Sequence, residues 1–537
     1  MNKLDLRYNS IINDLDLNQK LQEISEKNKK KYFNLINELN NLNSKNLLWI
    51  SSITSSKNIF LSRIYFYICI KELIDNNLKI IKKYSTILVN DKIVFKLIKH
   101  KTKDDNINII FKNDKSYFIL NIKRFFKIIS SIFFFKLFIK KKRILNKQTL
   151  FQIPISRTYK IENSIGLLKK FSNKNNYNKI IFIPYCVNKN IKEYISLIKL
   201  NNNDKVLFKQ SYISFCSYLK LFKIYISRNK INFFNNISDF DKKIIDYEYN
   251  KNLFDVSSFE SIEFYFFLKE LSDKSFKLNF LSIFENASIN KLWNLSIHNY
   301  FKNSINNGLK VMIPVKNYFS QYTILPSEYN LNLLPNKIFL VSDVLKKQLS
   351  NDNYFIKHLY FNGPALRIIS DNKNKKSKKI KAIFFFTSIL NFETEQIIKH
   401  LKLIKQNKEF QYFIKFHPSF DRATREKYLK LLPSFFKNNE ILKISNLHPD
   451  SIILSGMSSV ILDSIAFGIN TIYFDVGYFL SLNPILNNYS KIKSFHIFRF
   501  QNDINKLLFN INNYRSRKVK YDIYNHPNKR NVNQIYR

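Results

Sequence analysis

The sequence predicts an α/β protein with two domains, each built around a parallel sheet. The chain has 537 residues, a length that suits two or three domains of ordinary size. Short runs rich in Ile, Val and Phe alternate with stretches whose apolar residues recur at helical spacing. Unalternating apolar runs are typical of strands buried on both faces, and regular alternation of strand and helix is the pattern of parallel sheets.

Ten runs are expected to form strands. Six lie in the first two thirds of the chain, at residues 86–90, 180–184, 205–208, 278–284, 310–314 and 337–341. Four lie in the last third, at residues 380–386, 412–416, 451–454 and 471–474. Helical patterns lie between the strands, for example at residues 393–406 and 458–467.

The domain organisation follows from one charged stretch. Residues 371–379 contain no apolar side chain and predict a linker between a domain at 46–370 and a second domain at 380–513. Residues 1–45 are polar, with Leu and Ile at helical spacing, and predict a helical N-terminal extension. Residues 514–537 are rich in Asn, Lys and Arg and predict a loosely held polar tail.

Composition excludes several classes of protein. Six Gly and 11 Pro exclude collagen-like and Pro-rich architectures. Three cysteines, Cys69, Cys186 and Cys216, with no CxxC motif exclude a disulfide framework and a Cys-rich zinc site, and they favour a reducing compartment. The familiar Gly-rich phosphate loops are missing and no metal-ligand cluster is visible, so we expect no metal and no cofactor.

The net charge of +48 comes from 88 basic and 40 acidic residues. The excess of Lys, Asn, Ile, Phe and Tyr is what AT-rich codons supply, so part of the charge is explained by coding bias. A surface of this sign attracts polyanions, and a basic nucleic-acid-binding protein is one alternative function. Such a protein would carry a basic stripe interleaved with aromatics, whereas these lysines are scattered, which disfavours a nucleic-acid partner.

One segment, residues 123–143, has the composition of a membrane-interface helix. Its apolar run at 128–135 is too short to span a bilayer and is flanked by Lys and Arg. The alternative is a buried helix with solvated ends. On the first interpretation Ile129 is exposed, and the residues at an anionic membrane surface are Lys123, Arg124, Phe125, Phe126, Phe133, Phe134, Phe135 and Lys140. No secretory signal is visible, so we expect a cytoplasmic protein held peripherally at the inner membrane.

The most informative segment of the sequence begins with a predicted strand that is followed directly by His417-Pro418. A side chain just past the carboxyl end of a parallel strand points into the crevice where open α/β sheets bind ligands. Lys415 would add positive charge there if its side chain faces the same way. A histidine in this position is often only a satisfied surface or core residue, and His-Pro occurs again at 448–449 and 526–527.

About 40 residues later comes a second strand, a tight turn at Gly456, and a helix that begins at Ser458 or Ser459 and ends at Gly468. A helix N-terminus with two hydroxyls suits a phosphate group, although serine at this position is often only a cap. The order strand, His-Pro, strand, turn, Ser-Ser and helix favours a nucleotide-phosphate site.

This ordered pattern resembles the carboxyl-terminal half of GT-B glycosyltransferases that build bacterial surface polysaccharide. Kdo transferases, bacterial sialyltransferases and polyol-phosphate polymerases share a His-Pro and a later Ser-Ser or Ser-Thr of this kind. Residues 48–485 are also similar to a group of surface carbohydrate biosynthesis proteins of capsule and lipopolysaccharide. The matching residues are Trp49, Ser51, Ser52, Ser55, Asn58, Glu285, Trp293, Leu334, Pro335, Gly363, Arg367, Asn483 and Pro484.

The resemblance implies two Rossmann-like domains facing a cleft, with a nucleotide-sugar donor on the second domain. It implies that His417, Ser458, Ser459 and Lys415 hold the donor phosphate. It also implies an inverting, metal-independent transfer to a glycan or lipid-linked glycan, with CMP-activated acidic sugars as the preferred donors.

Inverting transfer needs a general base, and Glu285, at the end of a predicted strand, is our candidate. The alternative is that Glu285 only caps the next helix, and Asp463 is interpreted as structural. Related proteins carry a Gly-x-x-His segment where this chain has residues 313–317 without histidine. A non-catalytic scaffold of the same fold is therefore a further alternative.

Overall fold

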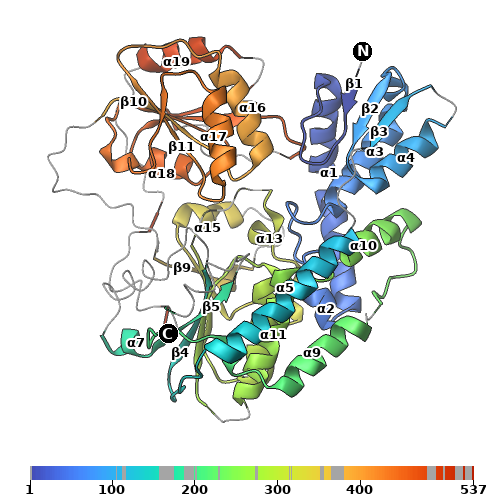
Figure 1. The fold of residues 1–537 in the computed structure, drawn as a ribbon, viewed down its shortest axis with the longest axis vertical. Helices are drawn as coiled ribbons and strands as arrows, with labels where there is room; N and C mark the ends of the chain where they lie inside the picture. The colour runs from blue at the N-terminus through green and yellow to red at the C-terminus, as the bar shows by residue number, and fades with distance from the viewer. Residues whose placement is uncertain are drawn as a thin grey trace.

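The computed structural model contains three parallel sheets with helices packed around them (Figure 1). It describes residues 3–103, 106–111, 117–155, 174–186, 199, 202–227, 230–272, 276–311, 313, 315, 317–350, 356–364, 380–480, 492–499, 502–513, 524–525 and 535–536. The predicted linker at 371–379, Arg367, Asn483 and Pro484 lie outside these ranges.

The N-terminal unit has a small sheet of its own, in the order β1-β2-β3. Its elements are β1 (Lys3–Asp5), α1 (Leu15–Leu42), α2 (Leu47–Ile50), α3 (Ile64–Ile81), β2 (Thr86–Val89), α4 (Lys92–Lys101) and β3 (Asn108–Phe111). The helix expected within residues 1–45 is present as α1, and the Asp14 side chain caps it by accepting the N–H of Leu17. The same stretch also contributes β1, because Leu4 is buried beside β2.

The first large sheet has the order β5-β4-β6-β7-β8-β9, and all its pairs are parallel. Its strands are β4 (Thr149–Ile155), β5 (Ile180–Cys186), β6 (Asn279–Ile283), β7 (Asn306–Lys310), β8 (Lys337–Leu340) and β9 (Tyr360–Asn362). Two predicted strands are wrong here. Residues 205–208 make only a single bridge, between Val206 and Phe182, and the strand expected at 310–314 lies earlier, as β7.

Helices surround this sheet and join it to the N-terminal unit. They are α5 (Tyr117–Phe138), α7 (Lys174–Asn178), η1 (Lys209–Ser211), α9 (Phe215–Ser227), α10 (Asp239–Lys251), α11 (Val256–Ser272), α12 (Ser288–Tyr300), α13 (Phe319–Tyr322), α14 (Pro326–Asn330), α15 (Asp343–Leu349) and η2 (Lys357–Leu359). Trp293 of α12 anchors the contact with α11, because its ring meets Phe264 edge-on at 5.2 Å.

Helix α5 is the segment expected at a membrane. Lys123, Phe126, Phe133 and Lys140 are exposed, whereas Arg124, Phe125, Ile129 and Phe134 are half-buried. Phe135 is only 2% exposed and contacts Phe208 in the core, so its assignment to the surface was wrong. Among the described residues, no helix has the length and apolar content needed to cross a bilayer.

The second large sheet has the order β12-β11-β10-β13-β14-β15, again with all pairs parallel. Its elements are β10 (Ala382–Phe386), α16 (Asn391–Leu401), β11 (Gln411–Lys415), α17 (Arg422–Leu431), β12 (Phe436–Asn438), η3 (Ile444–Asn446), β13 (Ile452–Ser455), α18 (Val460–Ala466), β14 (Asn470–Asp475), β15 (Phe495–Arg499) and α19 (Ile504–Asn513). All four strands expected in this part are present. The chain is therefore an α/β protein with two Rossmann-like sheets, as the sequence predicted.

Both ends of the chain reach across to the other domain. In the N-terminal unit, the Asn18 side chain donates to the carbonyl of Gly477, past β14, at 2.8 Å. Near the C-terminus, Asn525 donates its backbone N–H to the carbonyl of Val341 at 2.7 Å, and Ile535 is buried in the core of the first large sheet. At these points the predicted tail is bound to the first domain.

Candidate functional site

Strand register brings the predicted phosphate-binding residues to one edge of the second sheet. Phe386 of the central strand β10 pairs with Lys415 of β11 on one side and with Ser455 of β13 on the other. His417 and Ser458 follow these two strand ends, and two strand spacings separate β11 from β13 by about 10 Å. Both residues therefore lie at the carboxyl edge, where parallel sheets bind ligands.

His417 is held by its surroundings in one orientation. Its backbone N–H donates to Oγ1 of Thr387 at 2.7 Å, and its Nδ1 accepts the N–H of Ser419 at 3.2 Å. Burial and the neighbouring Arg425 lower the pKa of His417, so the half-buried ring is neutral at pH 7. A neutral ring that accepts at Nδ1 carries its proton on Nε2, which is thus a hydrogen-bond donor.

The Ser-Ser pair lies in the turn between β13 and α18, with both side chains half-buried. Ser459 is the N-cap residue, but its side chain makes no capping hydrogen bond. Ser458 Oγ accepts the N–H of Val460 at 3.3 Å, so this serine serves in part as the local cap. Lys415 is half-buried at the last position of β11.

Glu393, in the first turn of α16, is a site residue that the sequence analysis missed. Its side chain is fully buried, and its two carboxylate oxygens each lie 2.9 Å from the backbone nitrogen of Met457, whose N–H they accept. Burial raises the pKa of Glu393 to about 7, against the opposing effect of hydrogen bonds from Ser388 and Met457. A titratable carboxyl group thus adjoins the turn that presents Ser458, and no sequence pattern marked it.

The candidate base, Glu285, follows β6 at the carboxyl edge of the first sheet. Its carboxylate does not cap the next helix. Asn290 does so instead, because its Oδ1 accepts the N–H groups of Glu285 at 3.1 Å and Ala287 at 3.3 Å. Burial raises the pKa of Glu285, and the charge of Lys310, at the end of β7, opposes that rise.

A buried charged cluster, formed by Lys57, Lys291 and Glu328, lies beside this edge. Glu328 forms an ion pair with Lys57 and lies 3.3 Å from Nζ of Lys291, and all three side chains are fully buried. Asn286, the neighbour of Glu285, donates to the same carboxylate at 3.1 Å. The two lysines hold the pKa of Glu328 well below its usual range.

The backbone around this cluster is strained. The backbone φ is 57° at Lys57 and 50° at Asn286. Both values lie in the left-handed region, which residues other than glycine rarely adopt. Strained residues persist only where the surroundings hold them, and they are frequent at functional sites. Lys310 interacts electrostatically with Lys57 and Glu328 of this cluster. Burial lowers the pKa of Lys310 to about 7.

The two carboxyl edges converge on one apolar cluster. It contains Phe284, the residue before Glu285, and Ile461, two residues after Ser459. In Figure 1, α15 of the first domain lies directly below α18 of the second, where this cluster is found. Glu285 and Ser459 are thus each within two residues of a shared core between the domains.

Fold and site define an α/β protein with two Rossmann-like domains whose carboxyl edges converge. No family model matches the chain, and no curated protein matches it. Within the described ranges, no group of three His, Cys, Asp or Glu side chains is arranged to hold a metal ion.

The solved structures to which this chain is similar include a UDP-GlcNAc 2-epimerase and glycosyltransferases. UDP-GlcNAc 2-epimerase from Neisseria meningitidis is 14% identical, with 72% of this chain and 98% of that chain covered and a TM-score of 0.39. CalG4, the calicheamicin glycosyltransferase, is 8% identical, with 73% and 94% covered and a TM-score of 0.37. A glycosyltransferase from Rickettsia africae is 10% identical, with 73% and 93% covered and a TM-score of 0.37.

Proposed function

We propose that this chain is a GT-B-type glycosyltransferase that takes its sugar from a nucleotide donor. The observation that supports this most is the convergence of the two carboxyl edges, one with His417 and the Ser-Ser pair and the other with Glu285. Ligands of parallel sheets bind at this edge, so two facing edges offer one binding site for each of the two substrates of a transfer.

On the donor side, the Nε2–H of His417 and the hydroxyls of Ser458 and Ser459 donate to the phosphate oxygens. These donors stabilise the negative charge that grows as the nucleotide leaves, which is the kind of stabilisation that contributes most to such reactions. Lys415 adds a positive charge at the end of the same strand. No metal ion is required by this arrangement.

On the acceptor side, Glu285 removes the proton of the attacking hydroxyl group. The oxygen forms a bond to the anomeric carbon, and the bond between that carbon and the phosphate oxygen breaks, with the electron pair leaving on the nucleotide. Attack from the side opposite the nucleotide inverts the anomeric centre. A raised pKa makes Glu285 a stronger base than an exposed glutamate.

The substrate class is proposed from the resemblance to enzymes of bacterial surface polysaccharide. The donor is then a CMP-activated acidic sugar and the acceptor a glycan or lipid-linked glycan of capsule or lipopolysaccharide, at the cytoplasmic face of the inner membrane. The fold alone does not specify the sugar, so the identity of the bound nucleotide should be determined first.

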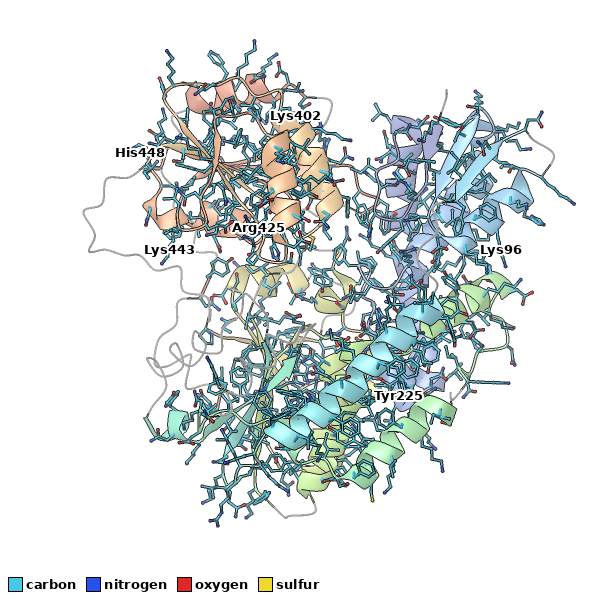
Figure 2. All side chains as sticks on the ribbon, viewed as in Figure 1. Lys96, Tyr225, Lys402, Arg425, Lys443 and His448 are labelled. Carbon is cyan, nitrogen blue, oxygen red and sulfur yellow. The ribbon has the colours of Figure 1, made fainter. Side chains whose placement is uncertain are left out.

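The test is a binding titration of the full chain with CMP, UDP, GDP and an oligonucleotide. We expect one nucleotide to bind, and His417→Ala and the double variant Ser458→Ala/Ser459→Ala to weaken that binding at least tenfold. His448→Ala is the matched control. His448 also precedes a proline, but it lies on the outer side of the second domain, away from the first domain (Figure 2). Binding that survives at His417→Ala, or binding of the oligonucleotide alone, would refute the donor site.

A non-catalytic scaffold is the second candidate, favoured by the lack of histidine at 313–317. It predicts nucleotide binding of the same strength with no release of nucleotide from a sugar donor in the presence of any acceptor.

A further inference from the structure

Helices α5 and α9 expose an unusual number of large apolar side chains. On α5, Phe126 is 63% exposed, Phe133 60% and Leu137 73%. On α9, Phe215 is 70% exposed, Leu219 55% and Ile226 80%. Scattered single residues of this kind are normal on a surface, but a set on two adjacent helices indicates an interaction site.

Helical spacing gathers these side chains into one stripe on each helix. The α9 residues 215, 219, 222 and 226 are separated by four, three and four positions. The α5 residues 122, 126, 133 and 137 are separated by four, seven and four positions, which also places them on one face. The two helices are in contact where the ring of Phe125, the neighbour of Phe126 in the α5 stripe, meets the ring of Phe222 edge-on at 5.9 Å. We call this two-helix face the α5/α9 surface.

The opposite faces of both helices are buried. Ile128 and Phe135 of α5 and Leu221 and Tyr225 of α9 lie in the core, and Tyr225 stacks on Phe254 at 5.2 Å. Figure 2 shows Tyr225 between the two helices. The exposed stripes are therefore held on a fixed support.

The charged residues within the two helical segments are of one sign. Residues 117–143 and 215–227 contain ten Lys and Arg and no Asp or Glu. Some of these cations are used internally: Lys136 donates to the carbonyl of Ile213, and Lys142 donates to that of Val206 at 2.8 Å. Lys123, Lys140, Lys220 and Lys223 are exposed.

We infer that the α5/α9 surface lies on an anionic lipid bilayer, with the aromatic and aliphatic side chains in the headgroup region and the exposed lysines on lipid phosphates. Apolar stripes flanked by lysines are the composition of interfacial helices. A second copy of the chain is disfavoured as the occupant, because a two-fold contact would bring the same cations face to face with no acid on either helix. The sequence analysis predicted a membrane contact for the α5 segment only, and the structure adds the exposed stripe of α9 to this surface.

The experiment is sedimentation of the full chain with phosphatidylcholine vesicles, with and without phosphatidylglycerol. We expect binding only to the anionic vesicles, and weaker binding as salt is added. Phe126→Ser/Phe133→Ser/Leu137→Ser and Leu219→Ser/Ile226→Ser should each weaken binding at least tenfold. Changing Lys123, Lys140, Lys220 and Lys223 to Ser should cost about fivefold for each cation lost.

Matched controls come from the second domain. Leu403, Ile441 and Phe509 are 64%, 88% and 67% exposed, and their change to Ser should leave vesicle binding unchanged. Lys402 and Lys443 lie far from α5 and α9 and serve as charge controls (Figure 2). Because all altered side chains are exposed, melting temperatures should match the parent chain.

Three results would overturn the inference. Equal binding to neutral and anionic vesicles would exclude recognition of lipid charge. Unchanged sedimentation of both helix variants would place the contact elsewhere. A dimer in solution that these variants dissociate, with no vesicle binding, would assign the α5/α9 surface to a second copy of the chain.

Discussion

Glu393 and Gly456 share one space at the carboxyl edge of the second sheet. A β-carbon added to Gly456 would lie 2.4 Å from Cδ of Glu393, well inside van der Waals contact. Only glycine therefore lets the Glu393 carboxylate reach the backbone N–H of Met457. The glycine was expected to serve a tight turn, and the structure shows that it also makes room for a buried acid.

The change Gly456→Ala should force the Glu393 carboxyl group out of its position. We expect a loss of about 1–3 kcal/mol in the free energy of unfolding, which is the usual cost of overpacking a filled site. Urea denaturation measures it. In the Glu393→Ala background the added methyl group has room, so the same change should cost much less, and equal costs in both backgrounds would contradict this account.

The raised pKa of Glu393 gives stability a definite pH dependence. Folding raises this pKa from 4.5 to about 7, so between these values the native chain keeps a proton that the unfolded chain has lost. The free energy of unfolding therefore falls as pH rises from about 4.5 to 7, by at most about 3.4 kcal/mol from this group. Glu393→Gln, which does not titrate, should flatten the slope in that window.

Denaturation of both chains at several pH values between 5 and 8 checks this. The quantity to compare is the difference between parent and variant, because all other titrating groups cancel in it. A difference that does not change with pH would show that Glu393 keeps an ordinary pKa.

Most of the strands with continuous apolar runs could be predicted from the sequence, whereas the polar strand β7 could not be placed correctly. β7 reads Asn-Asn-Gly-Leu-Lys, yet it is buried, because Asn306 donates to Asn294 and Asn307 donates to the carbonyl of Ile535. Ile535 lies 228 residues away from Asn307 in the chain. β4 contains Pro154, which is tolerated because β6 pairs with β4 only as far as Gln152.

For the candidate site, local order in the sequence was enough to predict where His417 and Ser458 lie, since strand ends in a parallel sheet share an edge. It was not enough for Glu393 or for the cluster of Lys57, Lys291 and Glu328. The members of that cluster come from three separate segments, and in the sequence each looks like an ordinary surface charge. Their burial follows only from the tertiary fold.

Glu328 should be far more important for stability than an exposed glutamate of similar pairing. Glu328→Gln leaves Lys57 and Lys291 buried without a counter-charge, and we expect a loss of about 3–5 kcal/mol in the free energy of unfolding. The control is Glu409→Gln. Glu409 lies 2.7 Å from Lys381 but its side chain is 61% exposed, so the loss should be about 1 kcal/mol or less. Chemical denaturation of both variants compares them, and similar losses would mean that the cluster is hydrated in solution.

Glu285→Gln should separate catalysis from donor binding. A base acts on the acceptor, so the variant should bind nucleotide as the parent does while its transfer rate falls about 10²–10⁴-fold.

The pH dependence of transfer distinguishes a catalytic role of Glu285 from a purely structural one. Lys310→Met removes the positive charge that opposes the rise in the pKa of Glu285, so the acidic limb of kcat/KM should move to higher pH. Lys381→Met, at a partly exposed ion pair in the other domain, should leave that limb in place. Full transfer activity in Glu285→Gln would remove Glu285 as the base, whereas an unmoved limb in Lys310→Met would mean that the group titrating in the profile is not beside Lys310.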